Sequence, residues 1–167
     1  YEFLPAHEQI AQAARYSLLG GGKRIRAVLA LAACELGGAA PEKALDYACA
    51  LEMLHCYSLI HDDMPCMDND DYRRGRLTNH KVFGEGMAVL AGDALLTDAF
   101  AVAARAKLPE PGKIGEAIAI LSECAGSLGM IGGQVLDIMS AQRACTEQEV
   151  LDIQSRKTGR LIVAPCV

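Results

Sequence analysis

Apolar residues recur at the three- and four-residue spacing of an α-helix along almost the whole chain, and this period constrains the fold most. Glycine clusters, a Pro/Gly-rich segment at 108–112 and one polar stretch interrupt it, and such residues end helices. The spacing predicts no strand, a polar loop over about 64–79 and a short turn over 80–84. It predicts helices over about 5–19, 23–36, 41–63, 86–107, 113–127 and 129–142, and a seventh opened by a Thr146–Glu149 capping box. We therefore expect an all-α fold.

Composition supports this fold class. The 167 residues are 51% hydrophobic but only 5% aromatic, and 27 of them are alanine, which loses no side-chain entropy in a helix. A β-sandwich would need more aromatic and β-branched residues, and a disordered chain would be less apolar. The length predicts a single helical domain over residues 1–167. We expect that domain to be incomplete at its C-terminal end, because the sequence stops within an apolar stretch.

The charge distribution limits the partners. A net charge of −5 argues against nucleic acid, which needs a basic surface. Basic residues nevertheless gather at 23–26 and 73–76, which suits a small anion. No signal peptide is visible and charged residues interrupt the apolar runs, so we expect no membrane insertion. Seven cysteines without a CxxC spacing favour small buried side chains in a reducing, cytoplasmic setting.

The densest cluster of chemistry-bearing residues runs from His61 to Asp71, where six acidic or amide side chains lie within ten positions. Carboxylates this close repel one another unless a cation lies between them, and Mg²⁺ prefers such oxygen ligands together with substrate phosphates. Asp62 closes an apolar helix, whose negative end also favours a cation. Pro65 should break that helix and let a loop return Asp68 toward Asp62. The alternative interpretation is a solvated acidic loop.

Basic residues and a histidine accompany this cluster. Arg73 and Arg74 follow it directly, and arginine binds phosphate through paired hydrogen bonds, so the combination suits a metal-bridged phosphate. Lys23 and Arg26 lie three residues apart at a helix start after three glycines, although the spacing is not that of a Walker A motif. His55 lies two helical turns before Asp62 on the same face and is a candidate for the same cavity.

Two weaker signals lie in the second half of the chain. Gln134 and Asp137 share one face of an otherwise apolar helix, and the preceding glycines at 132–133 indicate close packing or a bend. Gly159 could loosen a further helix and aim Lys157 inward.

Taken together, these motifs resemble the trans-isoprenyl diphosphate synthases. The matching stretches, in the order of that family, are 22–26, 55–75, 78–84, 91–96, 133–134 and 157–159. The aspartate-rich segment with its trailing Arg-Arg-Gly is the most specific of them. The resemblance implies antiparallel helices around a central cavity, a homodimer, and an Mg²⁺-dependent head-to-tail condensation of isopentenyl diphosphate with an allylic diphosphate.

The resemblance also implies a role for each candidate residue. Asp62 and Asp68 would hold Mg²⁺, with Asp63 in support. Arg73 would contact the allylic diphosphate. The remaining substrate-binding residues would be Lys23, Arg26, His55 and Arg74 for isopentenyl diphosphate, Lys157 and Thr158 on the allylic side, and Gln134.

Chain length is expected to depend on Tyr57 and Ser58, which lie about one turn before Asp62. An aromatic ring there would close the cavity, so we expect a C15 product, farnesyl diphosphate; the alternative is a geranylgeranyl diphosphate synthase. Two features depart from the family pattern: Ala27 stands where proline is usual, and a second aspartate-rich motif is absent. We therefore expect the 167-residue chain alone to be inactive.

Other functions explain less of the sequence. His61-Asp62 is the dipeptide of an HD-type metal phosphohydrolase, but His55 and His61, six residues apart, would point in different directions. A non-catalytic subunit of a prenyl synthase would have no need of the aspartates. A terpene cyclase would not need the basic residues at 23–26.

Overall fold

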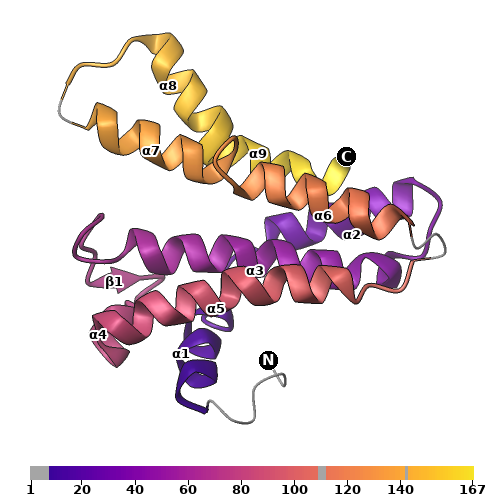
Figure 1. Ribbon diagram of the computed structural model, residues 1–167, viewed down its shortest axis with the longest axis horizontal. Helices are drawn as coiled ribbons and strands as arrows, with labels where there is room; N and C mark the ends of the chain where they lie inside the picture. The colour runs from indigo at the N-terminus through magenta and orange to yellow at the C-terminus, as the bar shows by residue number, and fades with distance from the viewer. Residues whose placement is uncertain (1–7, 109–111, 142) are drawn as a thin grey trace. The chain divides into compact units, whose positions relative to one another are not determined.

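The computed structural model describes residues 8–108, 112–141 and 143–167 (Figure 1). The all-α class is confirmed, because helices account for most of the described residues. In chain order, the helical elements are α1 (Glu8–Leu18), α2 (Ile25–Leu36), the 3-10 turn η1 (Pro41–Ala44), α3 (Leu45–Asp62), α4 (Asn79–Phe83), α5 (Glu85–Ala104), α6 (Gly112–Ala125), α7 (Met130–Ser140), α8 (Glu147–Gln154), the π-helical turn η2 (Ser155–Gly159), α9 (Arg160–Val163) and the 3-10 turn η3 (Ala164–Cys166).

The prediction that the chain has no strand is wrong in one place. Two strands, β1 (Tyr72–Arg73) and β2 (Arg76–Leu77), pair antiparallel within the loop expected over 64–79. Arg74 and Gly75 connect them with φ angles of 52° and 75°, and positive φ at both central residues is the geometry of a type I′ hairpin turn. Strands of two residues are too short to produce an alternating pattern, so the hydrophobic period did not reveal them.

The helix boundaries differ from the expected ones mainly at the ends. The helix expected from Pro41 begins as η1 and becomes α-helical only at Leu45. The expected turn over 80–84 is the short helix α4. The expectations for residues 5–7, for 109–111 in the Pro/Gly-rich segment and for residue 142 lie outside the described residues.

The capping box predicted at Thr146 is confirmed. The backbone N–H of Glu149 donates to Thr146 Oγ1, and the backbone N–H of Thr146 donates to a Glu149 carboxylate oxygen at 2.9 Å. These two bonds satisfy N–H groups that have no partner inside the first turn of α8.

The described residues form two compact units, each with its own core. The first comprises residues 8–24 and 52–101, and the second comprises 25–51 together with the described part of 102–167. In the first unit, one face of α5 is fully buried at Ala88, Ala91, Leu95 and Ala99, which are spaced three and four residues apart. The fully buried side chains of the second unit include those of Ala50, Ala103 and Leu161. Small residues on these faces allow close helix packing, as the alanine content indicated.

Two stretches are long and apolar enough to cross a membrane by length and composition alone. They are Glu85–Ala104, with a mean hydropathy of 1.6, and Gly112–Ser140, with 1.4. The core helix of a soluble protein passes the same test when it is mostly buried, and 33% of the first stretch is buried, on one face of α5. In the second stretch a turn at 126–129 separates α6 from α7.

Candidate active site

The aspartate-rich loop begins where α3 ends. Asp62 is the last residue of α3, and after Pro65 the chain turns back, so that the backbone N–H of Asp68 donates to the Asp62 carbonyl at 2.8 Å. The N–H groups of Met67 and Asn69 both donate to the Met64 carbonyl, at 2.9 and 3.0 Å. The predicted break at Pro65 is therefore confirmed, and the loop returns the backbone of Asp68 to Asp62.

The ligand set at this loop fits a metal that is shared with a substrate. Asp62 is half-buried and Asp68 is exposed, at the negative end of the α3 dipole. Within the described ranges, no group of three or more histidine, cysteine, aspartate or glutamate side chains is arranged to hold a metal ion by itself. Mg²⁺ is commonly held by one or two carboxylates plus substrate phosphates. Two carboxylates at one loop suit that arrangement better than a site made only of protein ligands.

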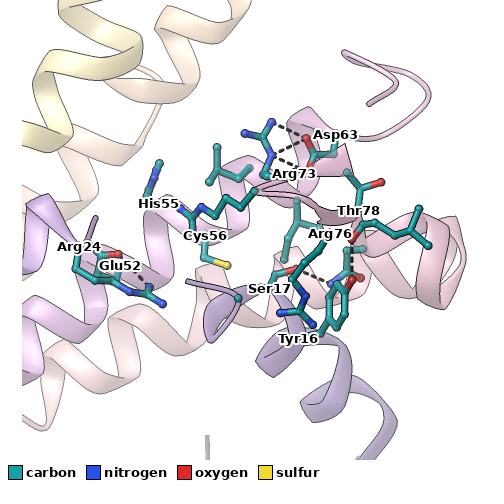
Figure 2. Close-up of a pocket in the computed structure, with 16 residues that line it drawn as sticks. Tyr16, Ser17, Arg24, Glu52, His55, Cys56, Asp63, Arg73, Arg76 and Thr78 are labelled. Atoms are coloured by element: carbon teal, nitrogen blue, oxygen red, sulfur yellow. Dashed lines mark hydrogen bonds and ion pairs between the residues drawn. The ribbon is translucent and has the colours of Figure 1, made fainter. Parts of the chain in front are cut away.

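Asp63 is turned away from this exposed position and pairs with Arg73 of β1 (Figure 2). Asp63 is only 2% exposed, and its two oxygens accept from Arg73 Nε at 2.7 and 2.8 Å, while Arg73 Nη2 lies 2.5 Å from Oδ1. The hydrogen bond to Asp63 is the largest cause of the raised pKa of Arg73. Asp63 therefore orients the arginine that was predicted to meet the allylic diphosphate.

Arg74 points to a different partner, because the turn after β1 separates the two arginines. Its Nη1 donates to the Gly21 carbonyl. A Cβ on Gly22 would come within 2.6 Å of the Arg74 guanidinium, and Gly22 has a φ of +120°, so this position requires glycine. Arg74 thus lies against the loop that leads to the exposed Lys23. Arg26, expected to act with Lys23, belongs to the other unit.

A small pocket in the first unit brings several predicted residues together (Figure 2). It has a volume of ≈ 50 Å³, and His55, Arg73 and Arg74 line it. This volume suffices for a few water molecules and is too small to enclose a prenyl chain. Apolar side chains, Leu59 and Ile60 among them, line the pocket together with these polar ones.

Other residues of the pocket have structural partners. Arg24 donates to Glu52, at 3.2 Å, and to the Leu18 carbonyl, at 2.6 Å. Arg76 lies over the Tyr16 ring, 4.1 Å from its centroid. Burial raises the pKa of the Cys56 thiol to about 12, so this thiol stays protonated and is not a nucleophile.

Sequence reasoning missed a polar network that ties the loop to α1. Thr78 Oγ1 donates to the Asp70 carbonyl at 2.8 Å, and Asn79 Nδ2 donates to the Ala13 carbonyl and to Ser17 Oγ, both at 2.8 Å. Thr78 and Asn79 are each 2% exposed. Both residues lie in the stretch 78–84 that resembles the family. The only other sign of this network in the sequence was that two polar residues stand side by side between helical segments.

Tyr57 is buried within α3, as the chain-length prediction requires, at 5% exposure. Its ring meets the ring of His61 edge-on, with centroids 5.8 Å apart, and burial is the main cause that raises the pKa of its hydroxyl to about 12. Among the described residues the hydroxyl has no hydrogen-bond partner. Ser58 instead donates to the His55 carbonyl of its own helix at 2.9 Å.

The second unit holds the remaining predicted residues around η2. The π-helical turn confirms that the helix loosens at Lys157 and Gly159, and Lys157 Nζ donates to Asp137 of α7 at 2.7 Å. A Cβ on Gly133 would lie 2.2 Å from the Lys157 backbone nitrogen, so the predicted close packing is also confirmed. Gln134 Oε1 is buried without a hydrogen-bond partner among the described residues, and Thr158 is exposed.

The chain belongs to the polyprenyl synthetase family, whose model matches residues 7–167. It is 51% identical over 162 residues to geranylgeranyl pyrophosphate synthase 7, chloroplastic, of Arabidopsis thaliana. The aligned residues cover 95% of this chain and 47% of that protein. It is 48% identical over 166 residues to the farnesyl diphosphate synthase of Micrococcus luteus. The aligned residues cover 99% of this chain and 57% of that protein. The chain therefore spans about half the length of the curated relatives it matches.

A solved structure agrees with the fold. The geranyltransferase of Legionella pneumophila superposes with a TM-score of 0.94 at 39% identity, over 99% of this chain and 59% of that chain. The isoprenoid synthase fold implied by the sequence resemblance is thereby confirmed.

Proposed function

We propose that the whole protein catalyses the head-to-tail condensation of isopentenyl diphosphate with an allylic diphosphate, with Mg²⁺ as cofactor. The observation that supports this most is the loop that returns Asp68 to Asp62 while Asp63 holds Arg73 beside it. Two carboxylates and an oriented guanidinium at one loop suit a diphosphate whose charge is shared between a metal and the protein. Membership of the polyprenyl synthetase family supports the same reaction class.

In this proposal each group of residues has a separate task. Asp62 and Asp68 hold Mg²⁺, which would neutralise the diphosphate charge so that the allylic C–O bond can break. Arg73 contacts the departing diphosphate in the orientation that Asp63 imposes. Lys23, Arg26, His55 and Arg74 bind isopentenyl diphosphate, whose double bond attacks the allylic cation. The new carbocation then loses a proton to the released diphosphate. Lys157 and Thr158 bind on the allylic side, and Gln134 is a further substrate-binding residue.

We propose farnesyl diphosphate as the product, with geranylgeranyl diphosphate as the alternative. The relatives include both geranylgeranyl and farnesyl diphosphate synthases, so their names do not decide the product. The argument for the C15 product is the buried Tyr57 ring, which would block a longer chain about one helical turn below Asp62.

The test is an assay of the purified whole protein with Mg²⁺, isopentenyl diphosphate and either dimethylallyl or geranyl diphosphate. Chromatography of the dephosphorylated products should show a C15 alcohol from both primers. A C20 alcohol would support the geranylgeranyl alternative, and no Mg²⁺-dependent product from either primer would contradict the proposed reaction. The same assay on the 167-residue chain tests the expectation that it is inactive alone.

We further propose a cytoplasmic homodimer without membrane insertion or nucleic-acid partners, and a single catalytic domain that includes residues 1–167. None of the seven cysteines, all of which lie in the described residues, forms a disulfide, and this suits a reducing compartment. Sedimentation of the whole protein would measure the oligomeric state directly.

A further inference from the structure

The last turn of α3 packs against α5 through a contact that the proposed site does not use. His61, directly before Asp62, inserts its ring against Gly92 of α5. A Cβ on Gly92 would lie 2.1 Å from His61 Nε2 and 2.5 Å from Cδ2, so no other residue fits while the ring stays in place. The imidazole of His61 therefore occupies the space that a side chain at position 92 would fill.

The His61 ring has three neighbours, two at its Nε2 and one at its face or edge. Its Nε2 lies 3.1 Å from the Val89 carbonyl, and because a carbonyl can only accept, Nε2 carries the proton and donates. Asp93 Oδ1 lies 3.8 Å from the same nitrogen, too far for a hydrogen bond but close enough for attraction. The Tyr57 ring meets the imidazole edge-on at 5.8 Å. Moving the ring would break each of these contacts.

We propose that His61 and Gly92 are positioning residues that fix the end of α3, and with it the Asp62 carboxylate, for metal binding. Asp62 is covalently next to His61, and Asp68 is bonded to the Asp62 backbone, so a displaced His61 shifts the backbone that carries both carboxylates. A ligand displaced by a fraction of an ångström binds its metal more weakly. The proposal rests on the proposed function, because that function assigns Mg²⁺ to Asp62 and Asp68.

The test compares Gly92→Ala with Gly86→Ala in the whole protein. Both substitutions add one methyl group to α5, but Gly86 has no atom within 4 Å of an added Cβ. The first readout is the Mg²⁺ concentration that gives half-maximal condensation. The second readout needs no turnover. Inorganic pyrophosphate is kept at a fixed concentration, and the readout is the Mg²⁺ concentration that gives half of the maximal rise in melting temperature. We expect Gly92→Ala to raise both concentrations about tenfold and Gly86→Ala to leave both unchanged.

A double substitution identifies the cause. His61→Ala should also raise the Mg²⁺ requirement, because the contact that holds α3 is lost. Adding Gly92→Ala to His61→Ala should then have no further effect, because no ring remains for the methyl group to meet. An equal effect of Gly92→Ala with and without His61 would refute the proposal.

Two other results would also decide it. If Gly92→Ala lowers the melting temperature but leaves both Mg²⁺ concentrations unchanged, the contact is merely structural and the proposal is wrong. If Gly92→Ala does not fold, His61→Ala alone decides, and an unchanged Mg²⁺ requirement in that variant would contradict the proposal. Should the wild-type protein lack condensation activity, the proposed function fails, whereas the pyrophosphate readout still tests the positioning contact.

Discussion

Each unit contains a carboxylate paired with a cation, and the two pairs differ in exposure and geometry. In the first unit, the side chain of Asp63 is 4% exposed and that of Arg73 is 32% exposed; in the second, those of Asp137 and Lys157 are 46% and 30% exposed. The arginine binds both oxygens of its partner, whereas the lysine donates one bond, at 2.7 Å. Asp63 is therefore committed to Arg73, while Asp137 retains contact with solvent.

Under the proposed function, the difference gives two ways to present a cation to an anionic substrate. A buried carboxylate fixes the planar guanidinium in one orientation, because two hydrogen bonds define a plane. A half-exposed carboxylate holds an ammonium group that can exchange partners at little cost, because water replaces the lost contact. Arg73 is thus suited to a fixed contact and Lys157 to one that forms when substrate arrives.

The largest expected effect concerns neither pair but Asp62 and Asp68, the metal ligands proposed above. Asp62→Ala or Asp68→Ala should lower kcat for condensation by about 10²–10³-fold, because the diphosphate charge would then lack its metal. Asp71→Asn is the matched control in the same loop: Asp71 is exposed and pairs with Lys81, so kcat should stay within about twofold. A large loss in Asp71→Asn would show that loop charge as a whole matters, not the two ligands.

Asp63→Ala tests the buried pair. We expect the free energy of unfolding to fall by about 2 kcal/mol, since Arg73 loses its charge-assisted hydrogen bonds, and we expect activity to fall as well. Denaturant titration measures the stability. Asp70→Ala provides the comparison, because Asp70 lies 3.8 Å from the same guanidinium and its side chain is 52% exposed. Equal losses of stability in the two variants would show that the buried Asp63 holds Arg73 no more firmly than the exposed Asp70 does.

Lys157→Ala should separate stability from substrate binding. The pair with Asp137 is half-exposed, so the free energy of unfolding should change by no more than about 0.5 kcal/mol. The KM for the allylic diphosphate should rise about tenfold, which corresponds to one charge-assisted hydrogen bond. Lys113→Ala, which breaks the exposed pair with Glu116 at 2.9 Å, should change neither quantity. A KM unaffected by Lys157→Ala would contradict the assigned role.

Tyr57 provides a third case, a buried polar group without a partner among the described residues. Tyr57→Phe removes only the hydroxyl, so the protein should gain about 1 kcal/mol of stability and keep its product length. Tyr57→Ala removes the ring and should lengthen the product, measured by chromatography. A product of unchanged length in Tyr57→Ala would show that another residue closes the cavity.

Local features of the sequence predicted much of this structure. The helices follow from the hydrophobic period, and the return of Asp68 follows from the steric effect of Pro65. The close approach at Gly133 and the loosened turn before Gly159 follow from where glycine interrupts a helical pattern. Each of these depends on residues within a few positions of one another.

The missed features depend on distant partners. Asn79 bonds to Ala13 and Ser17, more than sixty residues away, and no local pattern reveals that pairing. The buried Glu52 takes Arg24 as its partner across 28 positions. The resemblance to a known family gave Asp63 a supporting role beside Asp62, but it did not show which partner Asp63 binds. That partner, Arg73, lies on a hairpin whose strands are too short to predict.

The π-helical turn at 155–159 makes the second unit sensitive to chain length rather than to composition. This turn holds one residue more than an α-helical turn. Deleting the extra residue would restore a regular helix, in which later side chains keep their direction and Leu161 keeps its fully buried place. The wide turn that aims Lys157 at Asp137 would be lost. A single deletion is therefore expected to disturb this ion pair while leaving a well-packed fold.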